Sequence, residues 1–122
     1  MSEQKVKSYE DLKVWQKAHE ITLSIYKITQ KFPSDEKFGL ISQARRCSSS
    51  IAANIVEGHA RSSRKDFAHF LTIARGSLEE LKYFIRLSKD LDFVAMEDFQ
   101  RLNQQCDELG RMLYVFRQKL NA

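Results

Sequence analysis

Proline and glycine are scarce in this sequence, whose 122 residues include one Pro and 4 Gly. Folds built from many short strands need frequent turns, and turns depend on these two residue types. The scarcity therefore argues against β-sandwiches, β-barrels and Rossmann-type folds. Cysteine is scarce too, with Cys47 and Cys106 as the two examples. Two cysteines are too few for a disulfide framework, and neither lies in a cluster with metal-ligand spacing.

Long apolar runs are also missing. No stretch approaches the roughly 18 apolar residues that cross a membrane. Residues 1–13 lack the apolar core of a signal peptide. We therefore expect a cytoplasmic protein with reduced thiols and no membrane partner. The composition is otherwise that of one globular domain, with 43% hydrophobic residues, 30% charged residues and a net charge of +4.

Apolar residues recur at alternating intervals of three and four, the period of a helix with one buried face. Four segments carry this pattern: Val14, Ala18, Ile21, Ile25, Ile28 and Phe32; then Phe38, Ile41, Ala44, Ser48, Ile51 and Ile55; then Phe67, Leu71, Ala74, Leu78, Leu81, Ile85 and Ser88; and finally Phe99, Leu102, Cys106, Leu109, Leu113, Phe116 and Leu120. We predict helices over about residues 8–32, 35–59, 63–90 and 95–120. Ser8, Ser34 and either Ser62 or Ser63 are expected as N-caps, and Pro33 ends the first helix.

The connections between these helices are short, so consecutive helices should be antiparallel neighbours. The sequence thus predicts an all-α, single-domain, up-down-up-down four-helix bundle over residues 8–122. A flexible N-terminal segment, residues 1–7, precedes it. Gly76 lies inside the third helix, where it costs about 1 kcal/mol relative to Ala. We expect a close contact between the second and third helices to offset that cost. Gly58 is read as the stop signal of the second helix.

Aromatic residues exceed what one bundle core uses. Trp15, Tyr26, Phe70 and Phe84 lie beside the buried stripes of their helices. One interpretation is a wide core with aromatic edges. The other is a face for self-association, because exposed aromatic patches mark interfaces.

Catalytic and metal-binding patterns are absent. The serine run at residues 48–50 lacks the glycine-flanked turn of a nucleophile and has no histidine beside it in sequence. The paired Glu-x-x-His elements of a di-iron bundle are missing as well. We expect no enzyme activity, no metal and no cofactor.

Basic residues give the remaining signal. Candidates for contact with nucleic-acid phosphates are Arg45, Arg61, Arg64 and Lys65, followed by Lys13 and Lys17. The alternative for each is a solvated face with ion pairs. For Arg46 a structural pair with Glu79 or Glu80 is favoured, because all three should lie at one level of the bundle. Asn54 is expected near His69, as a polar contact between helices. Structural roles are assigned to Arg46, Asn54, Glu57, Gly58, Gly76 and Glu79.

The stretch from Phe32 to Leu81 contains a set of short motifs. They are Phe32-Pro33, Gly39-Leu40, Arg45-Arg46, Ser50-Ile51, Asn54-Ile55, Glu57-Gly58 and the run from Ala74 to Leu81, reading ARGSLEEL. In these motifs the sequence resembles the bacterial four-helix-bundle proteins encoded within intervening sequences of 23S rRNA. The opening residues 9–15 fit the same family. The chain is also similar to the accessory protein of diversity-generating retroelements, a basic pentameric bundle that binds nucleic acid and a reverse transcriptase.

The resemblance implies a ring-like homopentamer, which would use the surplus apolar surface. Together with the charge pattern it leads to our leading expectation, a non-enzymatic homo-oligomer that binds structured RNA or other nucleic acid. The alternative is a protein-interaction scaffold that docks a partner such as a reverse transcriptase.

Overall fold

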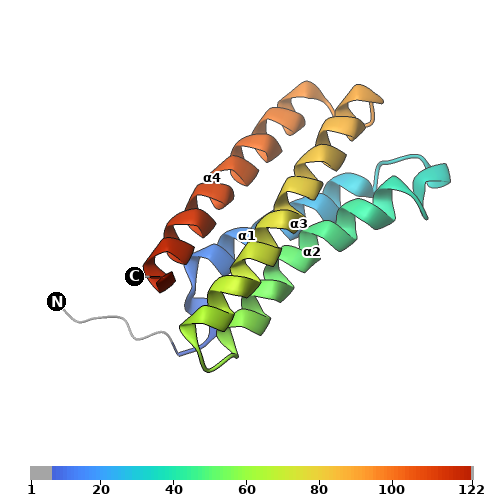
Figure 1. Cartoon of the computed structure of the whole chain (residues 1–122). Coiled ribbons are helices and arrows are strands. Elements are labelled where there is room, and N and C mark those ends of the chain that lie inside the picture. The colour runs from blue at the N-terminus through green and yellow to red at the C-terminus, as the bar shows by residue number, and fades with distance from the viewer. Residues whose placement is uncertain (1–6, 122) are drawn as a thin grey trace.

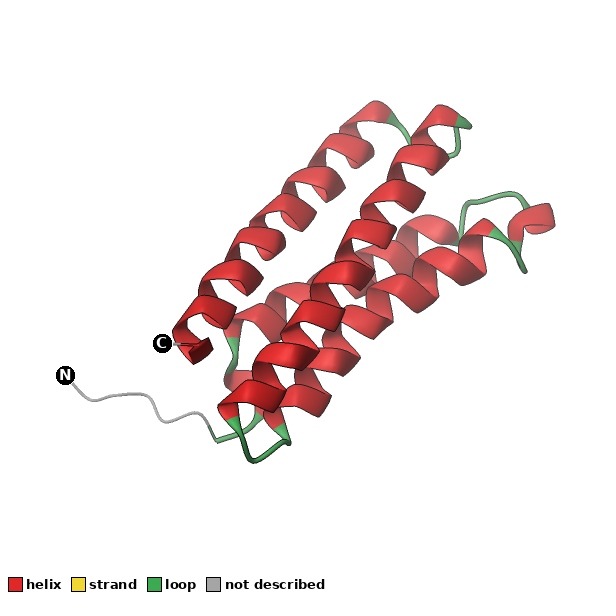
Figure 2. Ribbon diagram, viewed as in Figure 1, coloured by secondary structure: helices red, strands yellow, loops and turns green. Residues whose placement is uncertain are grey.

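The computed structural model describes residues 7–121, which form four α-helices and no strand (Figures 1 and 2). The helices are α1 (Lys13–Thr29), α2 (Leu40–His59), α3 (Arg64–Asp90) and α4 (Met96–Asn121). Two short 3-10 helices, η1 (Tyr9–Asp11) and η2 (Ser34–Glu36), precede α1 and α2. The all-α prediction is confirmed for this part of the chain. Of the segment expected to be flexible, residues 1–6 lie outside the described residues.

Contacts between distant residues show which helices are neighbours. The Thr22 hydroxyl of α1 donates to the Ser48 carbonyl of α2 at 3.0 Å, and Lys17 of α1 pairs with Glu108 of α4 at 3.1 Å. In Figure 1 the turn between α2 and α3 lies at the same end of the molecule as the start of α1 and the end of α4. The other two connections lie at the opposite end, so each end presents loops from different parts of the sequence.

The buried stripes follow the predicted period closely. The fully buried large side chains are Ile21, Ile25, Ile51, Ile55, Leu71, Leu78, Leu81, Leu102, Leu109, Leu113, Thr29 and Cys106. One predicted core residue is wrong: Phe38 is 88% exposed. The α-helix begins only at Leu40, so the spacing that joined Phe38 to the stripe does not apply there, and Leu40 is buried instead.

Two of the predicted helix starts are displaced for a local reason. Ser8 caps the 3-10 helix η1, and α1 begins at Lys13. Ser34 begins η2, whereas the carboxylate of Glu36 accepts a hydrogen bond from the Leu40 amide at 3.1 Å and caps α2. Ser63 caps α3, accepting from the Asp66 amide at 3.0 Å. A serine followed by acidic residues thus starts a helix, but that helix can be a 3-10 turn.

The glycine predictions need correction. A Cβ atom added to Gly76 would meet nothing within 4 Å, and the residue is exposed. It therefore makes no close contact with α2. Gly58 is the tight position, because a Cβ there would lie 2.8 Å from ring carbon Cδ1 of Phe67 and 2.8 Å from Cβ of Phe70. Gly58 lies inside α2 without a positive φ, so it allows close packing of α3 and is not a stop signal.

Candidate nucleic-acid interface

The turn between α2 and α3 is held by short local bonds. The Arg61 amide donates to the Gly58 carbonyl at 3.1 Å, and Ser63 then caps α3 as described. The missing side chain at Gly58 lets α3 approach closely just before this turn. Three predicted phosphate-binding residues, Arg61, Arg64 and Lys65, are exposed there within five consecutive positions. The three cations therefore lie exposed on a tight turn that is held by hydrogen bonds and by the packing of α2 against α3.

Arg61 has two partners on the protein. Its guanidinium lies 3.6 Å from the Glu57 carboxylate and 4.9 Å from the centroid of the Phe70 ring. Both side chains of the ion pair are about half exposed, so the pair contributes little to stability. The ring orients the guanidinium while leaving part of it in solvent. Glu57, predicted to be structural, thus lies within the predicted binding cluster.

Arg64 connects the turn to the last helix. Its guanidinium donates to the Lys119 carbonyl oxygen at 2.6 Å. The final carbonyls of a helix lack partners within the helix and carry partial negative charge, so a guanidinium stabilises them. This bond brings Lys119, from the far end of the sequence, beside the turn.

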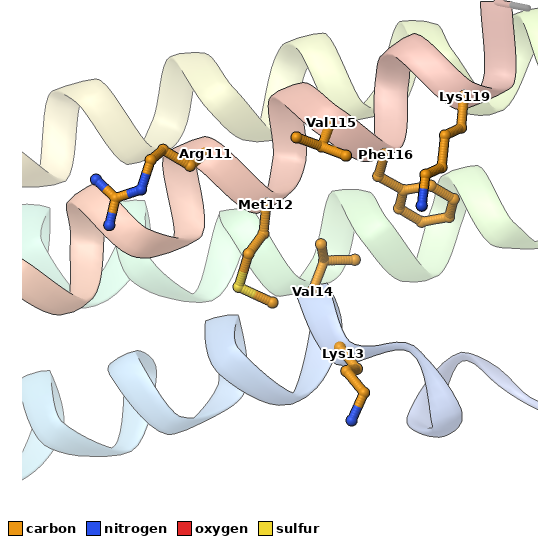
Figure 3. Close-up of a pocket in the computed structure, with 7 residues that line it drawn as sticks. All are labelled: Lys13, Val14, Arg111, Met112, Val115, Phe116 and Lys119. Atoms are coloured by element: carbon orange, nitrogen blue, oxygen red, sulfur yellow. The ribbon is translucent and has the colours of Figure 1, made fainter.

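An apolar groove lies between the first turn of α1 and the last third of α4 (Figure 3). Its volume is about 390 Å³, and its apolar lining comes from Val14, Met112, Val115 and Phe116. Lys13, Arg111 and Lys119 complete the lining, and no acidic side chain does so. We call the exposed cations of this groove and of the adjacent turn the basic end; they are Lys13, Arg61, Arg64, Lys65, Arg111 and Lys119.

The cations of the basic end are mostly without an ion-pair partner, although Glu57 and Asp66 lie at the same turn. Among its six cations, Arg61 alone forms an ion pair within the described residues. Arg86 and Lys89 pair with Asp90, and Arg101 pairs with Asp98, at the opposite end of the molecule. Five cations without an ion pair in the described residues therefore gather where the α2–α3 turn meets α1 and α4.

The other two predicted phosphate contacts, Lys17 and Arg45, lie outside the basic end, and each already has a partner on the protein. Lys17 pairs with Glu108, and its side chain is 17% exposed. Arg45 donates to the Thr29 hydroxyl at 2.9 Å and lies 4.6 Å from the Tyr26 ring centroid. Arg45 thus belongs to a different surface, where α1 and α2 meet.

The predicted pairs of Arg46 and Asn54 are absent from the described residues. Arg46 forms no ion pair with Glu79 or Glu80, because the Glu80 carboxylate instead lies 3.0 Å from the Cys47 sulfur and Glu79 lies 3.9 Å from Lys82. Arg46 is exposed instead.

Asn54 does not bridge to His69. Its amide donates to the Ser50 carbonyl at 2.8 Å within α2. Contact with α3 is made one turn away, where the hydroxyls of Ser50 and Ser77 lie 3.0 Å apart. The small residues of α2 therefore meet α3 through Ser77, which follows the exposed Gly76.

The four aromatic residues assigned to an oligomer interface have different surroundings. Trp15 and Phe84 are partly buried and pack against the core. Phe70 lies beneath Arg61, and Tyr26 is 42% exposed. The most exposed large apolar residues are others: Phe38 at 88%, Tyr83 at 60% and Leu23 at 58%. Trp15 and Phe84 thus favour the wide-core interpretation, whereas Leu23 and Tyr83 leave apolar surface for a partner.

The thiols are buried and protonated. Burial raises the pKa of Cys106 to about 12, and burial together with the Glu80 hydrogen bond raises the pKa of Cys47 to about 12. Neither thiol has the thiolate character of a nucleophile. No group of three or more potential metal ligands occurs in residues 7–121. No helix of the described chain is long and apolar enough to span a membrane.

Sequence reasoning missed Arg111 and Lys119 because the last helix carries no distinctive motif. Their neighbours in space, Lys13 and Arg64, are distant in sequence, and no local pattern records that proximity. Sequence reasoning also missed the exposure of Phe38, which it placed in the buried stripe. Its signal was available, since Gly39 follows it and glycine often marks a break in regular structure.

Fold and motifs agree with one class of protein, a small all-α domain of four helices. The model of the 23S rRNA-intervening sequence protein family matches residues 10–115, so the chain belongs to this family. The family predicted from the sequence motifs is thereby confirmed. No curated protein matches the sequence.

A solved structure is also similar. It is a crystal structure from Bacteroides thetaiotaomicron VPI-5482 of a protein described as having unknown function and belonging to the S23 ribosomal protein family. The TM-score is 0.76 with 27% sequence identity, over 85% of this chain and 97% of that chain.

Proposed function

We propose that this chain is a non-enzymatic, nucleic-acid-binding protein that holds structured RNA at its basic end. In this proposal the up-down-up-down bundle assembles into a ring-like homopentamer. The observation that carries it is the basic end itself. Six exposed cations from α1, α3, α4 and the α2–α3 turn meet there, and one of them forms an ion pair within the described residues. Exposed arginines of this kind contact phosphates through charged, bidentate hydrogen bonds.

Assembly would strengthen a modest charge. Each chain carries +4, so a ring of five carries about +20. Several weak phosphate sites on one ring also bind a single RNA with avidity. The exposed Leu23 and Tyr83 support assembly, because apolar side chains of this size gain stability when a second chain covers them.

The test is binding of a labelled structured RNA and a matched DNA duplex across a salt series. We expect the logarithm of the binding constant to fall linearly with the logarithm of salt concentration, with a slope of roughly −0.7 to −0.9 per neutralised phosphate. The variant Arg61→Gln/Arg64→Gln/Lys65→Gln should weaken binding and reduce the slope by about 2 to 3.

A charge-matched control is available at the other end of the bundle. The variant Arg86→Gln/Lys89→Gln/Arg101→Gln removes the same number of cations, each of which pairs with an aspartate. It should leave the affinity and the salt slope nearly unchanged. Equal losses in both variants would show that total charge matters and that the basic end is not a site. Absence of binding by the native chain at low salt would refute the proposal.

A protein-interaction scaffold is the second candidate. The apolar groove between α1 and α4 favours it, because Val115 there is 51% exposed beside Met112 and Phe116. A partner such as a reverse transcriptase would seat apolar side chains in this groove, and its binding would depend little on salt. The salt series separates the two candidates, and a reverse-transcriptase gene beside this one would favour the scaffold.

A further inference from the structure

A second hollow, remote from the basic end, lies where α1 passes into α2, at the cyan end of the ribbon in Figure 1. Its volume is about 410 Å³. We call it the Phe38 hollow; it is lined by Tyr26, Lys37, Phe38, Ile41, Ser42, Arg45 and Arg46. The lining therefore combines two aromatic rings with three cations and contains no carboxylate.

Phe38 is exposed because of how the chain enters α2. Residues 37–39 form the turn between η2 and α2, and the Glu36 carboxylate and the buried Leu40 hold that turn on either side. The Phe38 ring is 88% exposed, more than any other large apolar side chain described. Lys37 places its ammonium 5.5 Å from the ring centroid. An aromatic face thus stands in solvent next to a positive charge.

The opposite side of the hollow is held more firmly. Arg45 donates to the Thr29 hydroxyl at 2.9 Å and to the Tyr26 carbonyl at 3.3 Å. These bonds keep its guanidinium 4.6 Å from the Tyr26 ring centroid. A guanidinium positioned by hydrogen bonds needs little reordering to meet a ligand. Arg46, exposed and without an ion pair in residues 7–121, adds a third cation at the rim.

Resting on the proposed function, we propose that the Phe38 hollow binds an unpaired segment of RNA, with a base stacked on Phe38 and phosphates held by Lys37, Arg45 and Arg46. Proteins bind single strands by this combination of aromatic stacking and cationic contacts. A base in a duplex has both faces covered by its neighbours, so the hollow selects unpaired nucleotides. The all-cationic rim favours a phosphate-bearing ligand over a neutral apolar one.

The Phe38 hollow and the basic end lie at opposite ends of α2. That helix has 20 residues and is therefore about 30 Å long. A very short oligonucleotide can occupy one site without reaching the other, which separates the two proposals by experiment. A structured RNA with a stem and an unpaired loop could reach both.

The probe is a single-stranded RNA tetranucleotide containing 2-aminopurine, whose fluorescence is quenched by stacking. We expect quenching on binding to the native chain, and the Phe38→Ala variant should lose affinity by about 5- to 150-fold, which is the range for removal of one stacking ring. Arg46→Gln should reduce the salt slope by about 0.7. Phe38 is exposed, so its variant should keep the native melting temperature.

The matched control is Tyr114→Ala, which removes an aromatic side chain of 49% exposure on α4, outside the hollow. It should bind the tetranucleotide as the native chain does. The triple variant at the basic end should also bind it normally, although its affinity for structured RNA falls. Equal binding of the tetranucleotide by the native and Phe38→Ala proteins would refute the hollow as a stacking site.

The outcomes separate the two proposals. Salt-dependent binding of structured RNA with no effect of Phe38→Ala on either probe leaves the basic end standing and removes the hollow. Failure of both probes at low salt removes both. A lower sedimentation mass of Phe38→Ala, with no change in tetranucleotide binding, would assign the hollow to contact with a second copy and overturn the proposal.

Discussion

Single residues in this protein matter according to what surrounds them, and its glycines show this clearly. Gly58 and Gly76 both lie inside helices, yet one is buried against two phenylalanines and the other is exposed with open space around it. Both lie in family-like motifs, which gives no hint of the difference. The difference comes from Phe67 and Phe70 of α3, which pack on α2 at the position where Gly58 has no side chain.

We predict opposite effects of alanine at these two positions. Gly76→Ala should raise the free energy of unfolding by about 0.5–1 kcal/mol, since alanine favours a helix and meets no neighbour. Gly58→Ala should lower it by about 1–2 kcal/mol, because the clash with Phe67 and Phe70 exceeds the gain in helix propensity. Urea denaturation of the two variants measures both values. Stabilisation by Gly58→Ala would contradict the close packing of α2 and α3.

At the scale of elements, the ends of the helices determine where functional side chains lie. Ser63 caps α3, so the helix begins at Arg64 and the cationic turn ends there. The Glu36 cap starts α2 at Leu40 and leaves Phe38 outside the helix. In both candidate sites, the functional side chains lie beside a capped helix N-terminus.

Loss of the Ser63 cap should be measurable. Ser63→Ala removes the acceptor for the Asp66 amide and should lower the free energy of unfolding by about 1 kcal/mol. Ser62→Ala is the control, since Ser62 is exposed and makes no hydrogen bond among the described residues. Urea denaturation compares the two, and an equal effect would show that the cap contributes nothing specific. The affinity of the Ser63 variant for structured RNA should fall as well, because the turn loosens.

For the whole molecule, the distribution of exposed groups is what supports the proposed ring. Cations gather at the basic end and in the Phe38 hollow, near the two ends of α2, whereas apolar side chains such as Leu23 and Tyr83 lie exposed on α1 and α3. A monomer would leave these apolar side chains in water. A ring would cover them and multiply the positive charge.

We predict that sedimentation of the native chain gives a mass of about 72 kDa, five times the 14.3 kDa of one chain. The double variant Leu23→Glu/Tyr83→Glu should dissociate the ring, because buried carboxylates are costly at an apolar interface. A control that adds negative charge at an exposed polar position of α4, Gln104→Glu, should keep the native mass. A mass of one chain for the native protein would contradict the pentamer.

Much of the fold was predictable from sequence because the helical period reports burial directly. From Val14 to Leu113 the predicted stripes match the buried residues, with Phe38 as the clear exception. Part of the candidate site was predictable too, since Arg61, Arg64 and Lys65 are adjacent in sequence. Arg111 and Lys119 were not, because the contact that brings Lys119 to this turn spans 55 residues.

The sequence by itself determined the helical class, the stripes that form the core and the family, because each depends on local spacing or on short motifs. Only the tertiary structure decided which cations stay free and which are engaged. Arg45 bonds to α1, Lys17 pairs with α4 and Arg46 loses its expected partner to Cys47. The physical reason is that an ion pair depends on the distance between two side chains in space, and that distance is set by the packing of helices rather than by their order in the chain.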